Sequence, residues 1–215
     1  MIYAFTENYI LPISHDEVVY GKGSLINKMP GNYEDKFANV RAFMGYMMAH
    51  PGKKLLFMGS EFGQFKEWNY KEGLEFFLKE DYPLHAKLFE MNKELNHFYR
   101  TTKAFYEIED SWDGFEWLAA DDADRNMIAF MRKDSEGHKF VVAINFSGVT
   151  AEGYRLGVPK GKYQVVFNTD NPKFGGEGVW KKRIVNTQKK PSHGKEHSIL
   201  LELPKLTCVY LEKIQ

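Results

Sequence analysis

Two stretches of helical periodicity stand out in the first half of the chain. Residues 34–50 predict an amphipathic helix, because apolar side chains recur there at three- and four-residue steps. Residues 83–105 predict a longer helix with the same kind of apolar face. Asp81 and Pro83 are residues that favour the start of this second helix. Pro51 and Gly52 end the first one.

Two short apolar runs alternate with these helices. Lys54–Met58 predicts a strand buried on both faces of a parallel sheet, and Tyr9–Ile13 predicts a similar strand in spite of Pro12. The order strand, helix, strand, helix describes two consecutive β/α units. A closed (β/α)₈ barrel takes about 250 residues, so we expect these units to be part of something larger. The long segments 14–32 and 59–82 follow the two strands, and long ordered loops are usually functional.

The second half of the chain predicts strands almost throughout. Seven short apolar runs separated by turn residues fit an antiparallel β-sandwich. They are residues 116–119, 127–131, 140–144, 154–158, 163–167, 199–203 and 208–211. The predicted fold is therefore an α/β part over residues 1–106, followed by an all-β domain over residues 107–215.

Composition narrows the function classes. The 215 residues are 43% hydrophobic and 27% charged, which is typical of a globular protein rather than a disordered one. Lys and Arg number 29, as do Asp and Glu, so we expect neither a nucleic-acid nor a membrane partner. The sequence shows no membrane-spanning run and no signal peptide. It also has no cysteine pair, because Cys208 is the only cysteine. These features predict a cytoplasmic protein.

The densest polar cluster, Ser14–Glu17, directly follows the first predicted strand. In an arbitrary sequence such a cluster would be a capped turn. At the carboxyl end of a barrel strand, however, charged side chains point into the mouth of an active site. Asp16 and Glu17 are adjacent and face opposite ways in extended backbone, so we expect one to face the pocket and the other to support a loop.

The loop after the second strand offers two further candidates. Glu61 occupies the matching position one unit later, as either a pocket group or an ordinary loop carboxylate. Trp68 could stack on a sugar face or plug the loop, and the sequence does not choose between these roles.

Other motifs give weak signals. His193 and His197 have the spacing of a metal pair, but no cysteine pair accompanies them, so we expect no metal. The Gly21–Ser24 turn lacks the spacing of a phosphate-binding loop. Phe174–Gly178 lacks the context of a dinucleotide site and is interpreted as a flexible loop, so no cofactor is expected.

Several of these segments together resemble the C-terminal part of glycogen-branching enzymes of the α-amylase superfamily. The resemblance runs through the whole chain, and its most specific motifs are Leu11–Val19, Pro51–Gly59, Glu67–Asn69 and Gly114–Leu118. It implies the last two units of a (β/α)₈ barrel followed by an all-β domain. It also implies that an α-1,4-glucan is cleaved and transferred to a 6-hydroxyl, giving an α-1,6 branch.

By this resemblance Asp16 corresponds to the superfamily's third carboxylate, which grips sugar hydroxyls and stabilises the transition state. His15 corresponds to its neighbour on the same sugar, and we assign Glu61 and Trp68 to substrate binding. The nucleophile and the general acid of the family lie upstream of anything in this sequence. We therefore expect α-glucan and the missing N-terminal part of the same enzyme as partners, and no activity of the chain alone. The alternative is a non-catalytic α-glucan-binding module.

Overall fold

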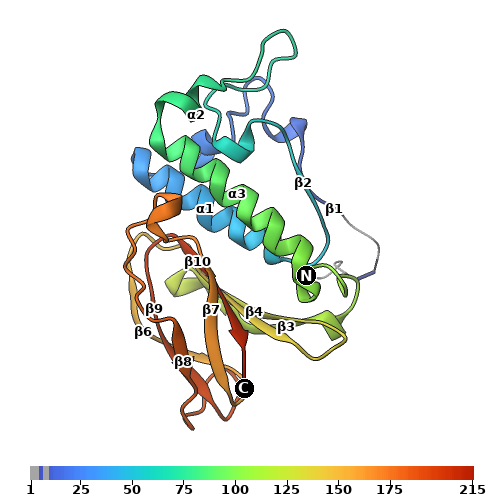
Figure 1. The fold of residues 1–215 in the computed structure, drawn as a ribbon, viewed down its shortest axis with the longest axis vertical. Coiled ribbons are helices and arrows are strands. Elements are labelled where there is room, and N and C mark those ends of the chain that lie inside the picture. Colours follow the sequence, from blue (N-terminus) through green and yellow to red (C-terminus); the bar gives the residue numbers. More distant parts are fainter. Residues whose placement is uncertain (1–4, 7–9) are drawn as a thin grey trace.

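The computed structural model describes residues 5–6 and 10–215, and it begins with a parallel pair of strands (Figure 1). The strands β1 (Ile10–Ile13) and β2 (Lys53–Leu56) pair in register from Ile10 opposite Lys53 to Ile13 opposite Leu56. Both predicted strands are thus present, although Tyr9 lies outside the described residues.

One expectation for the parallel pair is wrong, because β2 is not buried on both faces. Ile10, Leu55 and Met58 are 58%, 44% and 51% exposed. Ile10 and Leu55 lie on the same face of the pair, because Ile10 is opposite Lys53 and Leu55 is opposite Pro12. Only the other face, with Ile13 and Leu56, packs against the core of the described residues.

Two long helices account for the periodic segments. The helix α1 (Tyr33–Ala49) begins at Asn32, whose side-chain oxygen accepts a hydrogen bond from the Asp35 N–H at 2.8 Å. The helix α3 (Pro83–Thr101) has Pro83 in its first turn, as the sequence predicts. The short helix α2 (Phe77–Asp81) precedes α3 and was not predicted. None of the described helices is long and apolar enough to cross a membrane.

The rest of the chain forms antiparallel β-structure. A six-stranded sheet has the order β3-β4-β5-β10-β7-β8, and β6 pairs separately with β9. The strands are β3 (Phe115–Asp122), β4 (Met127–Lys133), β5 (Lys139–Asn145), β6 (Ala151–Gly157), β7 (Lys162–Asn168), β8 (Ile184–Asn186), β9 (Ser198–Leu203) and β10 (Thr207–Lys213). All seven predicted strands are found, and the eighth is the three-residue β8.

The six-stranded sheet is buried on both of its faces. One face packs on the β6–β9 pair and forms a core that includes Met131, Val141 and Leu201. The other face packs on α1 and α3, as Figure 1 shows, through side chains such as Met44, Phe130 and Tyr210. The predicted combination of an α/β part and an antiparallel β domain is confirmed, and the two parts share one core.

Candidate functional site

The carboxyl ends of β1 and β2 lie side by side. The Phe57 N–H donates to the Ile13 carbonyl at 2.7 Å and extends the pairing by one residue. Directly after β1 the chain forms a single 3₁₀ turn at His15–Glu17, and after β2 it forms another at Ser60–Phe62. Gly59, with φ of 92°, permits the sharp exit from the second strand. Both polar segments therefore start at the carboxyl end of the strand pair.

His15 and Asp16 interact directly at this carboxyl end of the strand pair. The His15 Nε2 atom lies 3.1 Å from Asp16 Oδ1, and their side chains are 52% and 69% exposed. Glu17 points to a different partner, because its carboxylate lies 4.0 Å from the ammonium of Lys28. The two adjacent carboxylates thus have separate neighbours, and Asp16 is the one held beside an imidazole.

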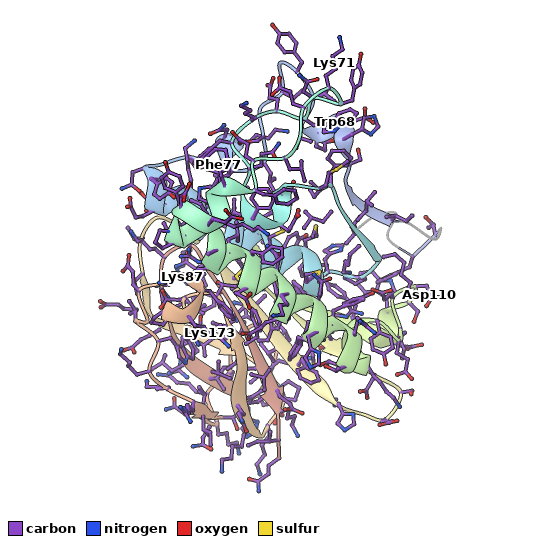
Figure 2. All side chains as sticks on the ribbon, turned by 45° about the horizontal axis from the view of Figure 1, so that its top comes forward. Trp68, Lys71, Phe77, Lys87, Asp110 and Lys173 are labelled. Carbon is purple, nitrogen blue, oxygen red and sulfur yellow. The ribbon has the colours of Figure 1, made fainter. Side chains whose placement is uncertain are left out.

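An aromatic cluster of His15, Phe57 and Trp68 adjoins Asp16. The ring centroids of His15 and Trp68 are 5.8 Å apart, and those of Phe57 and Trp68 are 5.4 Å apart in an edge-to-face arrangement. The Trp68 backbone N–H donates to the Val18 carbonyl at 2.8 Å, which ties the second loop to the first. Trp68 lies on the loops farthest from the β domain (Figure 2). Sequence reasoning missed Phe57, because it stands inside an apolar run that predicts a strand.

Glu67 holds the neighbouring glycine turn and was also missed. Its carboxylate accepts hydrogen bonds from the Gly21 N–H at 3.0 Å and from the Gly23 N–H at 2.6 Å. Both glycines have positive φ, at 81° and 76°, which directs their N–H groups to one side. The turn that loosely resembles a phosphate-binding loop therefore binds a carboxylate of its own chain.

Glu61 lies near the carboxyl end of the strand pair but is not part of the aromatic cluster. Its carbonyl accepts a hydrogen bond from the Asn92 side chain at 2.8 Å, which ties the turn to α3. Among the described residues, no contact connects the Glu61 carboxylate with His15, Asp16 or Trp68. The structure thus brings together three of the four predicted site residues and leaves Glu61 beside them.

His193, one of the two histidines with the spacing of a metal pair, contacts groups of its own chain. The Nδ1 atom of His193 lies 3.2 Å from the Gly157 N–H and 2.9 Å from the Ser192 hydroxyl oxygen. Within residues 5–6 and 10–215, no group of three or more His, Cys, Asp or Glu side chains could hold a metal ion.

The whole chain resembles known branching enzymes. It is 47% identical over 215 residues to the 1,4-alpha-glucan branching enzyme GlgB of Halothermothrix orenii, and 50% identical over 212 residues to that of Aquifex aeolicus. These alignments cover 99% and 98% of the chain and 34% of each relative. The chain is homologous to the C-terminal third of branching enzymes. It therefore spans about a third of the length of the curated relatives it matches.

The β domain and the overall fold agree with this relationship. Residues 117–213 match the family described as the alpha amylase C-terminal all-beta domain. An alpha-amylase from H. orenii aligns with 95% of this chain and 39% of its own, with a TM-score of 0.59 and 15% identity. An alpha-amylase from Geobacillus thermoleovorans covers 83% of this chain and 34% of its own, with a TM-score of 0.53 and 14% identity. At such low identity these two structures support the fold alone.

Proposed function

We propose that this chain is the C-terminal part of a 1,4-alpha-glucan branching enzyme that acts in the cytoplasm. Such an enzyme cleaves an α-1,4-glucan and transfers the cut chain to a 6-hydroxyl. The observation that carries the proposal is the position of Asp16 and His15 at the carboxyl end of β1, in a chain about half identical to branching enzymes. Barrel enzymes build their active sites at the carboxyl ends of their strands.

In this proposal Asp16 stabilises the transition state without forming a covalent bond. Its carboxylate accepts hydrogen bonds from sugar hydroxyls, and these bonds strengthen as positive charge develops on the ring. His15, 3.1 Å from Asp16, donates to the same sugar and orients the carboxylate. Trp68 provides an aromatic surface near the sugar, and Glu61 contacts the glucan farther along the chain.

The proposal gives residues 1–106 and 107–215 different tasks. The first range supplies one wall of the active site, and the second supports that wall through the shared core. Retaining glycosyl transfer needs a nucleophile and a general acid, two carboxyl groups roughly 5–5.5 Å apart. Both are assigned to the remainder of the enzyme, so the N-terminal part of the same enzyme is the partner of this chain.

The direct test is a chimeric enzyme. The part of the Halothermothrix orenii GlgB that precedes the matched region is joined to this chain, and new α-1,6 linkages in amylose are measured. We expect branching by the chimera and none by the 215-residue chain alone. Branching by the chain alone would refute the proposal. A well-folded chimera without activity, together with tight maltoheptaose binding by the chain, would instead favour the non-catalytic glucan-binding module.

A further inference from the structure

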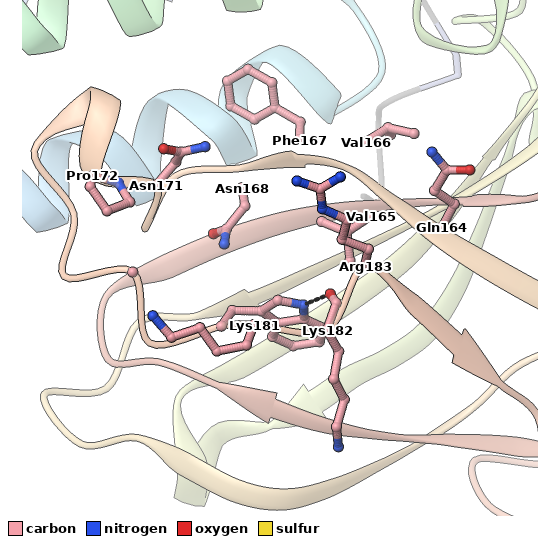
Figure 3. Close-up of a pocket in the computed structure, with 12 residues that line it drawn as sticks. Gln164, Val165, Val166, Phe167, Asn168, Asn171, Pro172, Lys181, Lys182 and Arg183 are labelled. Carbon is pink, nitrogen blue, oxygen red and sulfur yellow. Dashed lines mark hydrogen bonds between the residues drawn. The ribbon is translucent and has the colours of Figure 1, made fainter.

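A cavity lies on the β domain, far in sequence from the candidate site. It has a volume of about 480 Å³ and lies between β7 and the segment 178–183 (Figure 3). Its lining combines amide side chains, cations and one indole, of which Asn168, Asn171, Trp180, Lys181 and Arg183 matter most. Nothing in the proposed branching reaction uses this cavity.

The two asparagines offer hydrogen-bond donors in fixed positions. The Asn168 side-chain oxygen accepts from the Asp170 N–H at 2.9 Å, and the Asn171 side-chain oxygen accepts from the Lys173 N–H at 3.0 Å. Because a backbone N–H can only donate, each amide must present its oxygen to the backbone and keep its NH₂ group free. No described residue accepts a hydrogen bond from either NH₂ group.

The cations at the cavity also lack acidic partners. In the described part of the chain, neither Lys181 nor Arg183 forms an ion pair, and both side chains are exposed. The acidic residues of the adjoining loop are engaged elsewhere. Asp170 accepts hydrogen bonds from the Glu177 and Val179 N–H groups at 2.8 and 2.7 Å, and Glu177 lies 3.5 Å from the ammonium of Lys205. The charge at the cavity is therefore positive and uncompensated.

The loop that borders the cavity is built around a buried carboxylate. Asp170 is 6% exposed, and its own carbonyl accepts the Gly178 N–H at 2.9 Å. A Cβ atom on Gly176 would lie 2.2 Å from the Asp170 backbone, so only glycine allows this close approach. The segment 174–178, interpreted from the sequence as a flexible loop, has two backbone hydrogen bonds to Asp170, from the Glu177 and Gly178 N–H groups. The cavity has a preorganised wall.

Trp180 supplies the apolar surface. The indole packs partly against the core between the two sheets, and its N–H donates to the Lys182 carbonyl, drawn as the dashed line in Figure 3. This bond uses the only donor of the indole and fixes the plane of the ring. In the same view the amides of Asn168 and Asn171 and the guanidinium of Arg183 lie above Lys181 and Lys182.

We propose that this cavity binds a phosphate ester of a sugar. The unpaired groups are two amide NH₂ groups, a guanidinium and an ammonium, so they match a ligand rich in acceptor oxygens and negative charge. The sugar ring lies against Trp180 and its phosphate contacts Arg183, while Lys181 adds positive charge at the rim. The phosphate can come from a free sugar phosphate or from a phosphorylated α-glucan, since both offer the same chemistry.

The test is calorimetric titration of the complete chain with glucose 6-phosphate, phosphorylated dextrin, inorganic phosphate and unphosphorylated maltoheptaose. We expect both phosphorylated sugars to bind, and the double variant Lys181→Gln/Arg183→Gln to weaken both by about tenfold or more, the loss of at least one charge-assisted hydrogen bond. The control Lys189→Gln/Lys190→Gln removes the same charge from exposed positions outside the cavity and leaves binding unchanged.

The other probes separate the alternatives. Tighter binding of phosphorylated dextrin than of glucose 6-phosphate assigns the site to the polymer, and equal binding assigns it to the free ester; both support the proposal. Inorganic phosphate binding as tightly as both esters would overturn the role of the sugar. Maltoheptaose binding equally well, loss of binding in the control variant, or no binding of either ester at millimolar concentration would each overturn the proposal.

Discussion

Removing the buried guanidinium of Arg132 is predicted to destabilise the whole chain. Arg132 lies on β4 and is fully buried. Its guanidinium donates to the carbonyls of Ala49 at 2.8 Å, Gly114 at 3.2 Å and Ile108 at 3.2 Å. One side chain thus joins the end of α1, the connection between the two parts, and the sheet. Burial lowers the pKa of Arg132 to about 10, so the group stays charged at neutral pH.

The magnitude follows from the groups left behind. Arg132→Met keeps most of the apolar stem but leaves two buried carbonyls, those of Ala49 and Gly114, and the part-buried carbonyl of Ile108 without their donor. Each carbonyl left without a donor lowers the free energy of unfolding by about 1–3 kcal/mol. Part of this loss is offset, because the variant no longer buries a charged guanidinium. We expect a net loss of about 3–5 kcal/mol in the free energy of unfolding. For a chain of this size, that corresponds to a fall in Tm of roughly 6–20 °C.

Urea unfolding monitored by circular dichroism measures this loss, and thermal melts check it. The matched control is Arg125→Met, because the Arg125 side chain is 69% exposed and lies 3.7 Å from Asp122 in a surface pair. The control is expected to change stability by at most about 1 kcal/mol. An Arg132→Met loss below about 1 kcal/mol, or equal to that of the control, would refute the reasoning.

Two further predictions concern the interior. Burial lowers the pKa of Lys54 from 10.5 to about 7. Between these values the unfolded chain binds more protons than the folded one, so stability should rise from pH 7 to about pH 9, and Lys54→Met should flatten that rise in urea titrations at several pH values. Gly45→Ala places a Cβ atom 2.9 Å from the Cβ of Cys208, so we expect a loss of about 1–3 kcal/mol on thermal unfolding. Gly73→Ala, which meets nothing within 4 Å, should show no such loss.

The elements with a clear local pattern could be predicted from the sequence. The spacing of apolar residues gives α1 and α3 to within a few residues, and alternation with turn residues gives seven of the eight antiparallel strands. The strand β8 was missed because it has three residues and only Val185 is buried. A strand that short carries too few side chains to show a period.

The placement of a candidate site residue could be predicted where the residue directly follows a predicted strand. His15 and Asp16 follow a strand directly, and that placement carries over to the structure. The roles of Glu67 and Asp170 could not be predicted, because each carboxylate binds backbone N–H groups whose approach depends on loop geometry. The role of Arg132 could not be predicted either, because an arginine near a strand end is normally exposed. Its hydrogen-bond partners are also 18–83 residues away in sequence.

The most direct test of the central claim is the effect of Asp16→Asn on the chimeric branching enzyme. The substitution keeps the volume and removes the charge, so we expect kcat to fall by on the order of 10²–10⁴ while KM changes only a few-fold. Asp124→Asn, at an exposed turn of the β domain, serves as the matched control and should leave kcat unchanged. An Asp16→Asn enzyme with a kcat within a few-fold of the unsubstituted chimera would contradict the account.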